Sequence, residues 1–209
     1  MKTKLLVLFV AVFATASVLA FDRTEIRASA EEVTPLLNGM AVPNVKVQTT
    51  DGDPLSLHGL FMQKPTVVVF YRGGWCPYCT RQLAGLKDIE QDLVDAGYQI
   101  VAISPETPEM LQSQKLKTEF SAQLISDADL NAIRAFGVGF YVPDPMRKRL
   151  KDKANIELAA DDSERGVLPA PAVFIVDSQA RVLFSYVNPD YTVRPSAELV
   201  LSAAKLVKQ

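Results

Sequence analysis

The feature that most constrains this chain is an apolar run that ends at two glycines and a pair of cysteines. Residues 65–71 read Pro-Thr-Val-Val-Val-Phe-Tyr, a continuous β-branched and aromatic run typical of strands covered on both faces. Gly73-Gly74 ends this run, and apolar residues recur at helical spacing from Leu83 onward. The sequence therefore predicts a buried central strand that passes into a helix, with Cys76-Pro-Tyr-Cys79 at the junction.

The rest of the chain alternates strand and helix patterns. We expect a mixed α/β sheet with helices on both faces. The predicted strands are a hairpin over 45–57, strands at 99–104 and 124–125, and an antiparallel pair at 172–176 and 181–186. The predicted helices follow Thr107-Pro108, run from Asp127 through Phe136, and close the chain over 199–207.

Domain boundaries follow from the same pattern. Residues 21–38 are polar and read as an N-terminal extension, and residues 39–209 as one domain. Within that domain, residues 141–166 are charged, contain two prolines and interrupt the succession of strands and helices. We interpret them as an insertion, either a solvated helix and loop or a lid or partner-binding segment.

The first twenty residues are typical of a signal peptide. Lys2 and Lys4 form a basic start, an apolar run follows over residues 5–13, and small residues lead to Ala20. The alternative is an uncleaved membrane anchor, but the run is short for a membrane span. We expect residues 1–20 to be cleaved and the protein to be exported, periplasmic or secreted, with no stable membrane contact afterwards.

Charge and composition limit the partners. The chain has 22 basic and 24 acidic residues and a net charge of −2, with no block of one sign that would attract nucleic acid. Its hydrophobic fraction of 48% suits one globular domain with a real core. We expect no nucleic-acid partner.

The cysteine pair is better suited to redox chemistry than to stabilisation. These are the only two cysteines, and the very short loop that a bond between them would close removes little entropy from the unfolded state. At a helix N-terminus the free N–H groups favour an anion, so Cys76 can become a thiolate near neutral pH. It would attack a substrate disulfide, and Cys79 would resolve the mixed disulfide. A structural bridge and two buried free thiols are the alternatives.

A metal site is a weaker interpretation of the same pair. Zinc would need two further ligands, and the only histidine is His58. We expect His58 to cap or pack rather than to catalyse. No metal or organic cofactor is needed for thiol chemistry.

Residues 69–80, Val-Phe-Tyr-Arg-Gly-Gly-Trp-Cys-Pro-Tyr-Cys-Thr, resemble the peroxiredoxin-like branch of the AhpC/TSA (redoxin) superfamily. The resemblance extends from about Gly39 to the C-terminus and includes residues 168–177 and 189–194. It implies a thioredoxin-like fold, a central mixed sheet flanked by helices, here with an N-terminal β-hairpin extension. The Pro77-Tyr78 pair also resembles glutaredoxins over a few residues.

The chain departs from the peroxiredoxin pattern at two places. Peroxiredoxins carry Thr-x-x-Cys, so the resemblance places Cys79 at the peroxidatic position and Cys76 where the threonine stands. Their catalytic arginine precedes a late strand, where this chain has Pro171. The loss of this threonine and this arginine should slow the reaction with peroxide unless Arg72 or Arg165 takes over the role of the arginine. We expect both Arg72 and Arg165 at ordinary surface positions.

Other residues are expected to shape the substrate site. Pro171 resembles the cis-proline that thioredoxin-like oxidoreductases hold opposite their cysteines, with a plain proline-rich turn as the alternative. Trp75 and Tyr78 are predicted to form apolar surface beside the cysteines, or to pack in the core. Thioredoxins usually carry an acid where this chain has Phe70, so proton transfer must use another group or water.

Three functions remain open from the sequence. The first is an exported thiol–disulfide oxidoreductase in which Cys76 attacks, Cys79 resolves and Pro171 shapes the substrate groove. The second is an antioxidant peroxidase in which Cys79 attacks a hydroperoxide and Cys76 condenses with the resulting sulfenic acid. The third is a non-catalytic binding domain. The expected partners are protein disulfides or small thiols and hydroperoxides, with an unidentified thiol as electron donor.

Overall fold

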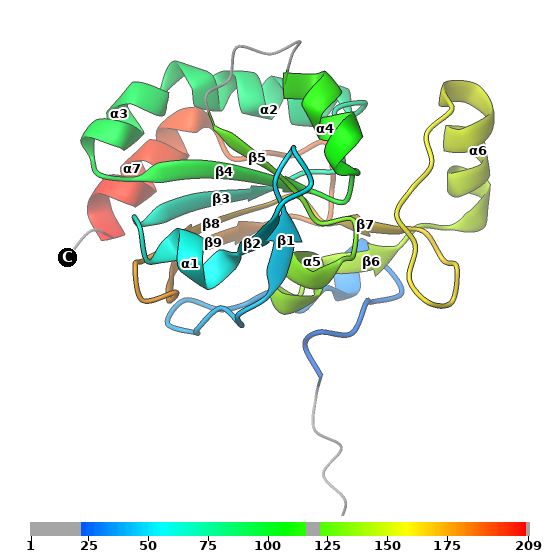
Figure 1. The fold of residues 1–209 in the computed structure, drawn as a ribbon, viewed down its shortest axis with the longest axis horizontal. Coiled ribbons are helices and arrows are strands. Elements are labelled where there is room, and N and C mark those ends of the chain that lie inside the picture. Colours follow the sequence, from blue (N-terminus) through cyan, green and yellow to red (C-terminus); the bar gives the residue numbers. More distant parts are fainter. Residues whose placement is uncertain (1–21, 116–121, 208–209) are drawn as a thin grey trace, which may run out of the picture.

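The apolar run at residues 65–71 forms an interior strand, β3 (Thr66–Phe70), whose five residues are all buried. A computed structural model describes residues 22–115 and 122–207, and the predicted signal peptide lies outside them (Figure 1). Strand β3 pairs parallel with β4 (Gln99–Ser104) and antiparallel with β8 (Ala172–Val176). The predicted buried central strand is confirmed.

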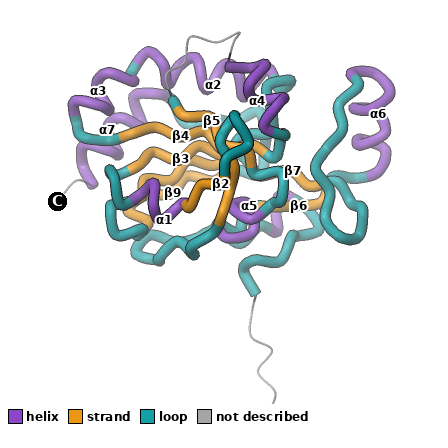
Figure 2. The backbone as a smooth tube through the Cα atoms, in the orientation of Figure 1, coloured by secondary structure: helices purple, strands orange, loops and turns teal. Residues whose placement is uncertain are grey.

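The main sheet has seven strands in the order β2-β1-β5-β4-β3-β8-β9 (Figure 2). Its centre is parallel and both edges are antiparallel, so the sheet is mixed, as predicted. The edges are the two predicted hairpins. The remaining strands are β1 (Lys46–Gln48), β2 (Pro54–Ser56), β5 (Gln123–Ser126) and β9 (Val182–Val187).

Helices cover both faces of this sheet (Figure 1). Because side chains alternate along a strand, Val67 and Val69 of β3 belong to one buried cluster and Val68 and Phe70 to the other. The first cluster packs under α2 (Pro77–Asp88), α3 (Glu90–Asp95), α4 (Pro108–Lys115) and α7 (Ala197–Val207). The second packs against α1 (Leu57–Phe61) and α5 (Asn131–Ala135).

Two helices differ from the expected pattern. The helical spacing after the cysteines is divided at Ile89, where α2 ends and α3 begins. The helix expected directly after Asp127 starts later, because Leu130 adopts a φ of 60°. The Asp127 carboxylate still binds this helix, accepting backbone N–H bonds of 2.8 Å from Ala132 and Ile133. Asp127 therefore caps the helix from a distance.

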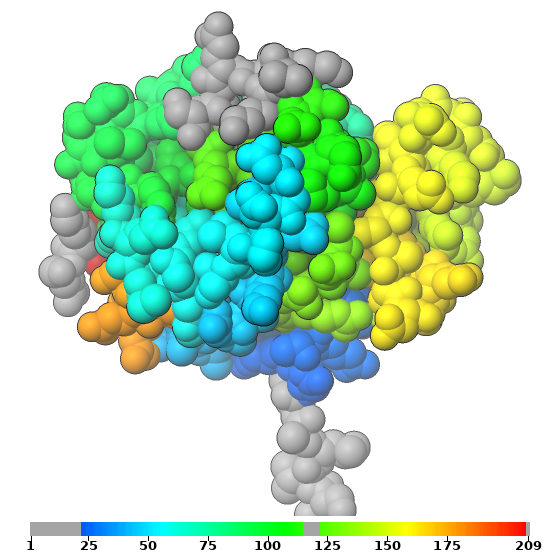
Figure 3. Space-filling model, viewed as in Figure 1, coloured from blue at the N-terminus to red at the C-terminus, as the bar shows by residue number. Residues whose placement is uncertain are grey.

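Residues 141–166 form an arm that stands out from the body of the molecule (Figure 3). Strand β6 (Gly139–Tyr141) enters the arm and pairs antiparallel with β7 (Val167–Pro169), which leaves it. Between them, α6 (Asp144–Ala154) has no buried residue. This arm is therefore held at its base by two short strands, outside the main sheet.

The N-terminal extension packs onto the domain through a 3-10 turn, η1 (Ala30–Glu32), and two buried side chains. Ile26 and Leu36 belong to the buried cluster that includes α5. The backbone of Arg27 forms an isolated parallel β-bridge with Phe140 of β6. None of the helices in the described ranges is long and apolar enough to cross a membrane.

Candidate redox site

The cysteines lie on the loop and helix that follow β3. Cys76 is the N-cap residue of α2, and Pro77 occupies the first turn, where a missing N–H costs nothing. Gly73, at a φ of +146°, gives the loop its shape. A Cβ at this position would lie 2.3 Å from Nε1 of Trp75, so only glycine fits here.

The two thiols are in direct contact and buried. The Sγ of Cys79 donates to the Sγ of Cys76 at 2.6 Å, and the two residues are 0% and 2% exposed. This hydrogen bond, together with the backbone N–H of Cys79 and the charges of two arginines, lowers the pKa of Cys76 to about 6. The same hydrogen bond and burial raise the pKa of Cys79. Near neutral pH the pair holds one proton, with the negative charge on Cys76.

Two guanidinium groups flank the sulfurs. Nη2 of Arg194 donates to the Sγ of Cys79 at 3.4 Å. Arg72 is 4% exposed, and its guanidinium lies 4.6 Å from the ring centre of Tyr191 and 5.2 Å from that of Trp75. The surface position expected for Arg72 is therefore wrong, because these two rings cover it.

Three N–H groups of these arginines are buried without a hydrogen-bond partner among the described residues. They are Nε of Arg72 and both Nε and Nη1 of Arg194. A buried donor without an acceptor costs about 1–3 kcal/mol, so such donors mark places for water or ligand oxygens. Arg165, the other candidate, lies on the arm, stacked 3.3 Å from the ring centre of Tyr141.

Arg194 is the functional residue that sequence reasoning missed. It lies 115 positions from Cys79, and only the fold brings the two together. The available signal was its place at the end of the family-like stretch 189–194, which carried no assigned role.

Two hollows are lined by residues that neighbour the cysteines in the chain. One, of about 280 Å³, is lined by Tyr78, Gln82 and Arg194 among others. The other, of about 380 Å³, is lined by Gly74, Trp75 and Glu106 among others. Trp75 and Tyr78 are both half-buried, each facing one hollow. Tyr78 also meets Tyr191 edge to face, with ring centres 5.7 Å apart.

Pro171 lies between β7 and β8 and is buried. Its neighbour Ala172 pairs with Phe70, so Pro171 stands at the end of the sheet from which the cysteine loop departs. All peptide bonds in the described ranges are trans, so the expected cis bond is wrong. Only two residues, Ala170 and Pro171, connect β7 to β8, and they do so through trans peptide bonds.

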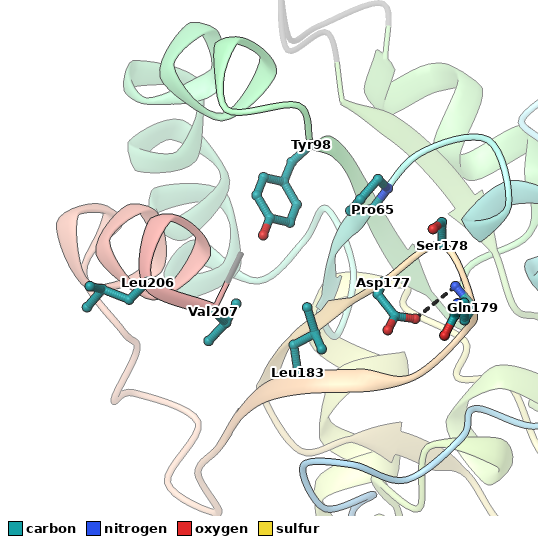
Figure 4. Close-up of a pocket in the computed structure, with 8 residues that line it drawn as sticks. All are labelled: Pro65, Tyr98, Asp177, Ser178, Gln179, Leu183, Leu206 and Val207. Atoms are coloured by element: carbon teal, nitrogen blue, oxygen red, sulfur yellow. Dashed lines mark hydrogen bonds between the residues drawn. The ribbon is translucent and has the colours of Figure 1, made fainter. Parts of the chain in front are cut away.

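Other candidate positions lie away from the sulfurs. Nε2 of His58 is 2.6 Å from the carbonyl oxygen of Val42, consistent with packing. A hollow of about 640 Å³ lies at the opposite end of β3, where Pro65 and Tyr98 line it (Figure 4). The Tyr98 hydroxyl donates to the carbonyl of Ala204 at 2.8 Å, so it serves to fix α7. Within the described ranges, no cluster of three His, Cys, Asp or Glu side chains could hold a metal ion.

A thioredoxin-like sheet with a cysteine pair where strand meets helix defines a thiol redox protein. The chain belongs to the AhpC/TSA family, whose model matches residues 39–185. It is 33% identical over 104 residues to Peroxiredoxin Bcp of Escherichia coli (strain K12). That match covers 50% of this chain and 66% of the relative, just under two thirds of its length. The predicted family is confirmed.

Solved structures show the same fold. The crystal structure of peroxidoxin BcpB from Mycobacterium tuberculosis superimposes with a TM-score of 0.63 at 19% identity, covering 82% of this chain and 98% of that one. Reduced Prx3 from Vibrio vulnificus, in complex with H2O2, gives 0.65 at 17% identity, covering 81% and 99%. The predicted fold class is confirmed.

Proposed function

We propose that this protein is a thiol-dependent peroxidase that reduces hydroperoxides through Cys79 and Cys76. One observation carries the proposal: Arg194 donates to the Cys79 sulfur, while other guanidinium nitrogens of Arg194 and Arg72 have no hydrogen-bond partner among the described residues. Such donors can hold the two oxygens of a hydroperoxide and stabilise charge on the leaving oxygen. Arg72 and Arg194 would thus supply the charge that the family's arginine supplies where this chain has Pro171. The peroxiredoxin relatives favour this function over disulfide exchange, which the sequence ranked first.

The first step uses Cys76 as a base. In the resting pair the Cys79 proton already points at the Cys76 thiolate. As Cys79 attacks the outer peroxide oxygen, its proton passes to Cys76, the O–O bond breaks, and the leaving alkoxide takes a proton from solvent. Cys79 becomes a sulfenic acid and the peroxide becomes an alcohol.

The second step closes the disulfide. The Cys76 thiol loses its proton and attacks the Cys79 sulfur, and the sulfenic oxygen leaves as water. The closeness of the two sulfurs permits this closure. An external thiol then reduces the disulfide and returns the pair to its starting state.

Disulfide exchange is the second candidate function, and the lowered pKa of Cys76 favours it. A thiolate at Cys76 at neutral pH can attack a substrate disulfide directly, with Cys79 as the resolving thiol. The two functions assign the first attack to different cysteines, so single substitutions separate them.

The test is trapping of the first intermediate. Cys76→Ser removes the base of the first step, but it also removes the hydrogen bond and charge that raise the pKa of Cys79. We therefore expect this variant, mixed with one equivalent of hydroperoxide, still to form a sulfenic acid at Cys79, more slowly than wild type, that dimedone labels and mass spectrometry locates. Cys79→Ser should form none at Cys76 at a comparable rate. If Cys79→Ser reacts with peroxide and Cys76→Ser does not, Cys76 is the attacking group. That result would contradict the proposed first step and would support disulfide exchange as the function.

We also propose export, on the signal-like pattern of residues 1–20. Expression of the full chain followed by fractionation should yield a mature protein outside the cytoplasm whose N-terminus begins near residue 21. An intact N-terminus in the cytoplasmic fraction would contradict it.

A further inference from the structure

Glu106 is a buried carboxyl group to which the two steps above give no role. It follows β4 and is 8% exposed. Its Oε2 accepts hydrogen bonds from the backbone N–H of Gly74 at 2.8 Å and from the Ser104 hydroxyl at 3.4 Å. Among the described residues, no lysine or arginine forms an ion pair with it. Burying a carboxylate without a cation costs free energy, which favours the protonated form of the carboxyl group. Glu106 can therefore take up a proton as well as release one.

The carboxyl group lies against the loop that carries Cys76. A Cβ placed on Gly73 would lie 2.8 Å from Cδ of Glu106 and 2.3 Å from the indole Nε1 of Trp75, so both groups meet beside this loop. Glu106 and Trp75 also line the hollow of about 380 Å³. The polar side chains of Ser113 and Gln114 also line this hollow, and it has room for water, which gives the carboxyl group a route to solvent.

The groups that face Glu106 keep its protonation sensitive to the cysteines. Burial raises its pKa, the hydrogen bonds from Gly74 and Ser104 lower it, and negative charge on Cys76 raises it again. From the end of β3, Tyr71 also interacts with Glu106, and its hydroxyl donates to Gln114 of α4 at 3.1 Å.

Among the described residues, the remaining nearby elements form no ion pair with the Glu106 carboxyl group. From β5, Ser126 donates to the backbone carbonyl of Glu106 at 2.7 Å, and the Asp127 carboxylate that follows binds the N–H groups of α5. Arg72 stacks on Trp75 and Tyr191 instead.

We propose that Glu106 is the proton-exchange group of Cys76, taking the thiol proton during disulfide closure and passing it to the departing oxygen. The inference rests on the proposed peroxidase function. Once Cys79 is a sulfenic acid, its thiol no longer donates to Cys76, and the largest cause of the low pKa of Cys76 is gone. Cys76 then needs a base.

The step balances with Glu106 in this role. The Cys76 S–H bond breaks and the proton moves through water in the hollow to the Glu106 carboxylate. The Cys76–Cys79 bond forms while the sulfenic S–O bond breaks, and the departing hydroxide takes the proton from Glu106 to leave as water. Glu106 ends as it began. It thus replaces, from the end of β4, the acid that β3 lacks at Phe70.

The experiment measures the rate of sulfenic acid formation at Cys79 and the rate of disulfide closure separately in the variant Glu106→Gln. Glutamine keeps an acceptor for the Gly74 N–H but cannot exchange a proton. Trp75 is the only tryptophan and precedes Cys76, so its fluorescence in stopped flow reports both sulfenic acid formation and disulfide closure after a pulse of hydrogen peroxide. Glu109→Gln is the matched control, because Glu109 is an exposed residue of α4 with the same charge.

We expect Glu106→Gln to form the sulfenic acid within about twofold of the wild-type rate and to close the disulfide roughly 100-fold more slowly, the lower range of general acid–base effects. The closure rate should then rise with pH without the wild-type plateau. Glu106→Asp should recover part of the rate, and Glu109→Gln should match wild type. Unchanged closure in Glu106→Gln would overturn the proposal, as would equal slowing of both steps with an unaltered pH profile.

A failure of the proposed peroxidase function can be distinguished from a failure of the proposed role of Glu106. If the wild-type protein forms no sulfenic acid, the peroxidase assignment falls, and Glu106 is tested by the pH profile of Cys76 alkylation with iodoacetamide. Glu106→Gln must change the shape of that profile and Glu109→Gln must not. An unchanged profile would overturn the role of Glu106 as well.

Discussion

The two sides of the cysteine pair are built from opposite charges. On the Cys79 side, Arg194 donates to the sulfur, and its buried Nε and Nη1 have no hydrogen-bond partner in the part of the chain that the structure describes. On the Cys76 side, the buried Glu106 carboxyl group accepts hydrogen bonds but forms no ion pair with any described residue. The first side is suited to hold an anion or a peroxide, and the second to hold a proton. The comparison teaches that the two cysteines have different charged neighbours, as the proposed division between binding of the oxidant and proton transfer requires.

The largest effect that would break this comparison is on the Arg194 side. Arg194→Met keeps an unbranched apolar stem but removes the guanidinium donor at the Cys79 sulfur, so we expect the rate of sulfenic acid formation to fall about 100-fold, the scale of losing one stabilising donor. Stopped-flow peroxide kinetics measure it. Arg81→Met is the control, because exposed Arg81 lines the same hollow and stacks on Tyr78, whereas among the described residues the guanidinium that donates to sulfur is that of Arg194. Equal losses in both variants would mean that net charge, and not contact, matters.

A second prediction concerns the loop on the Glu106 side. Gly73→Ala must push Trp75 and Glu106 away from the loop, and we expect the free energy of unfolding to fall by roughly 1–3 kcal/mol in urea titration. Gly52→Ala is the matched control, since Gly52 also has a positive φ but nothing within 4 Å of a new Cβ. Equal losses of unfolding free energy in the two variants would show that position 73 requires glycine because of backbone strain alone, and not because of packing against Glu106.

A third prediction tests where the charge of the pair resides. The alkylation rate of Cys76 should rise with pH through about 6 and then level off, because only the thiolate reacts. Cys79→Ala removes the hydrogen bond that most lowers the pKa of Cys76, so its profile should move to higher pH. At pH 6 the rate should drop about fivefold for the first unit of that move and about tenfold for each further unit. An unmoved profile would mean that the arginines, and not Cys79, stabilise the thiolate.

The smallest expected effect comes from Tyr191, which covers Arg72 and meets Tyr78. Tyr191→Leu removes a cation–π contact of about 0.5–1 kcal/mol at a partly exposed site, so the peroxide rate should fall only about two- to fivefold. A loss as large as that of Arg194→Met would show that Tyr191 holds Arg72 in its working position rather than merely shielding it.

Much of the fold was predictable because it depends on local patterns. The run at residues 65–71 predicted β3 since a strand covered on both faces needs apolar residues at successive positions. The strand at 99–104 and both hairpins followed from similar signals. The break at Ile89 was not predictable, because the apolar spacing continues across it and only packing divides the helix.

The candidate site was predictable only in part. Cys76 and Cys79 are near each other in the chain, so their spacing and their place at the start of a helix predicted that the two sulfurs would be in contact. Arg72 was identified but misplaced at the surface, since its cover comes partly from Tyr191, far along the chain. The cis form of Pro171 was inferred from a resemblance and not from a local signal, and the peptide bond before Pro171 is trans in the structure.

The sequence by itself determined the central strand, the cysteine pair at its end and the family to which the chain belongs, because each is carried by residues close together in the chain. The tertiary structure alone decided what surrounds the sulfurs. Arg194 comes from before α7, and Glu106 from the end of β4. Electrostatic effects on a thiol depend on distances in space, which only the folded sheet and its helices set.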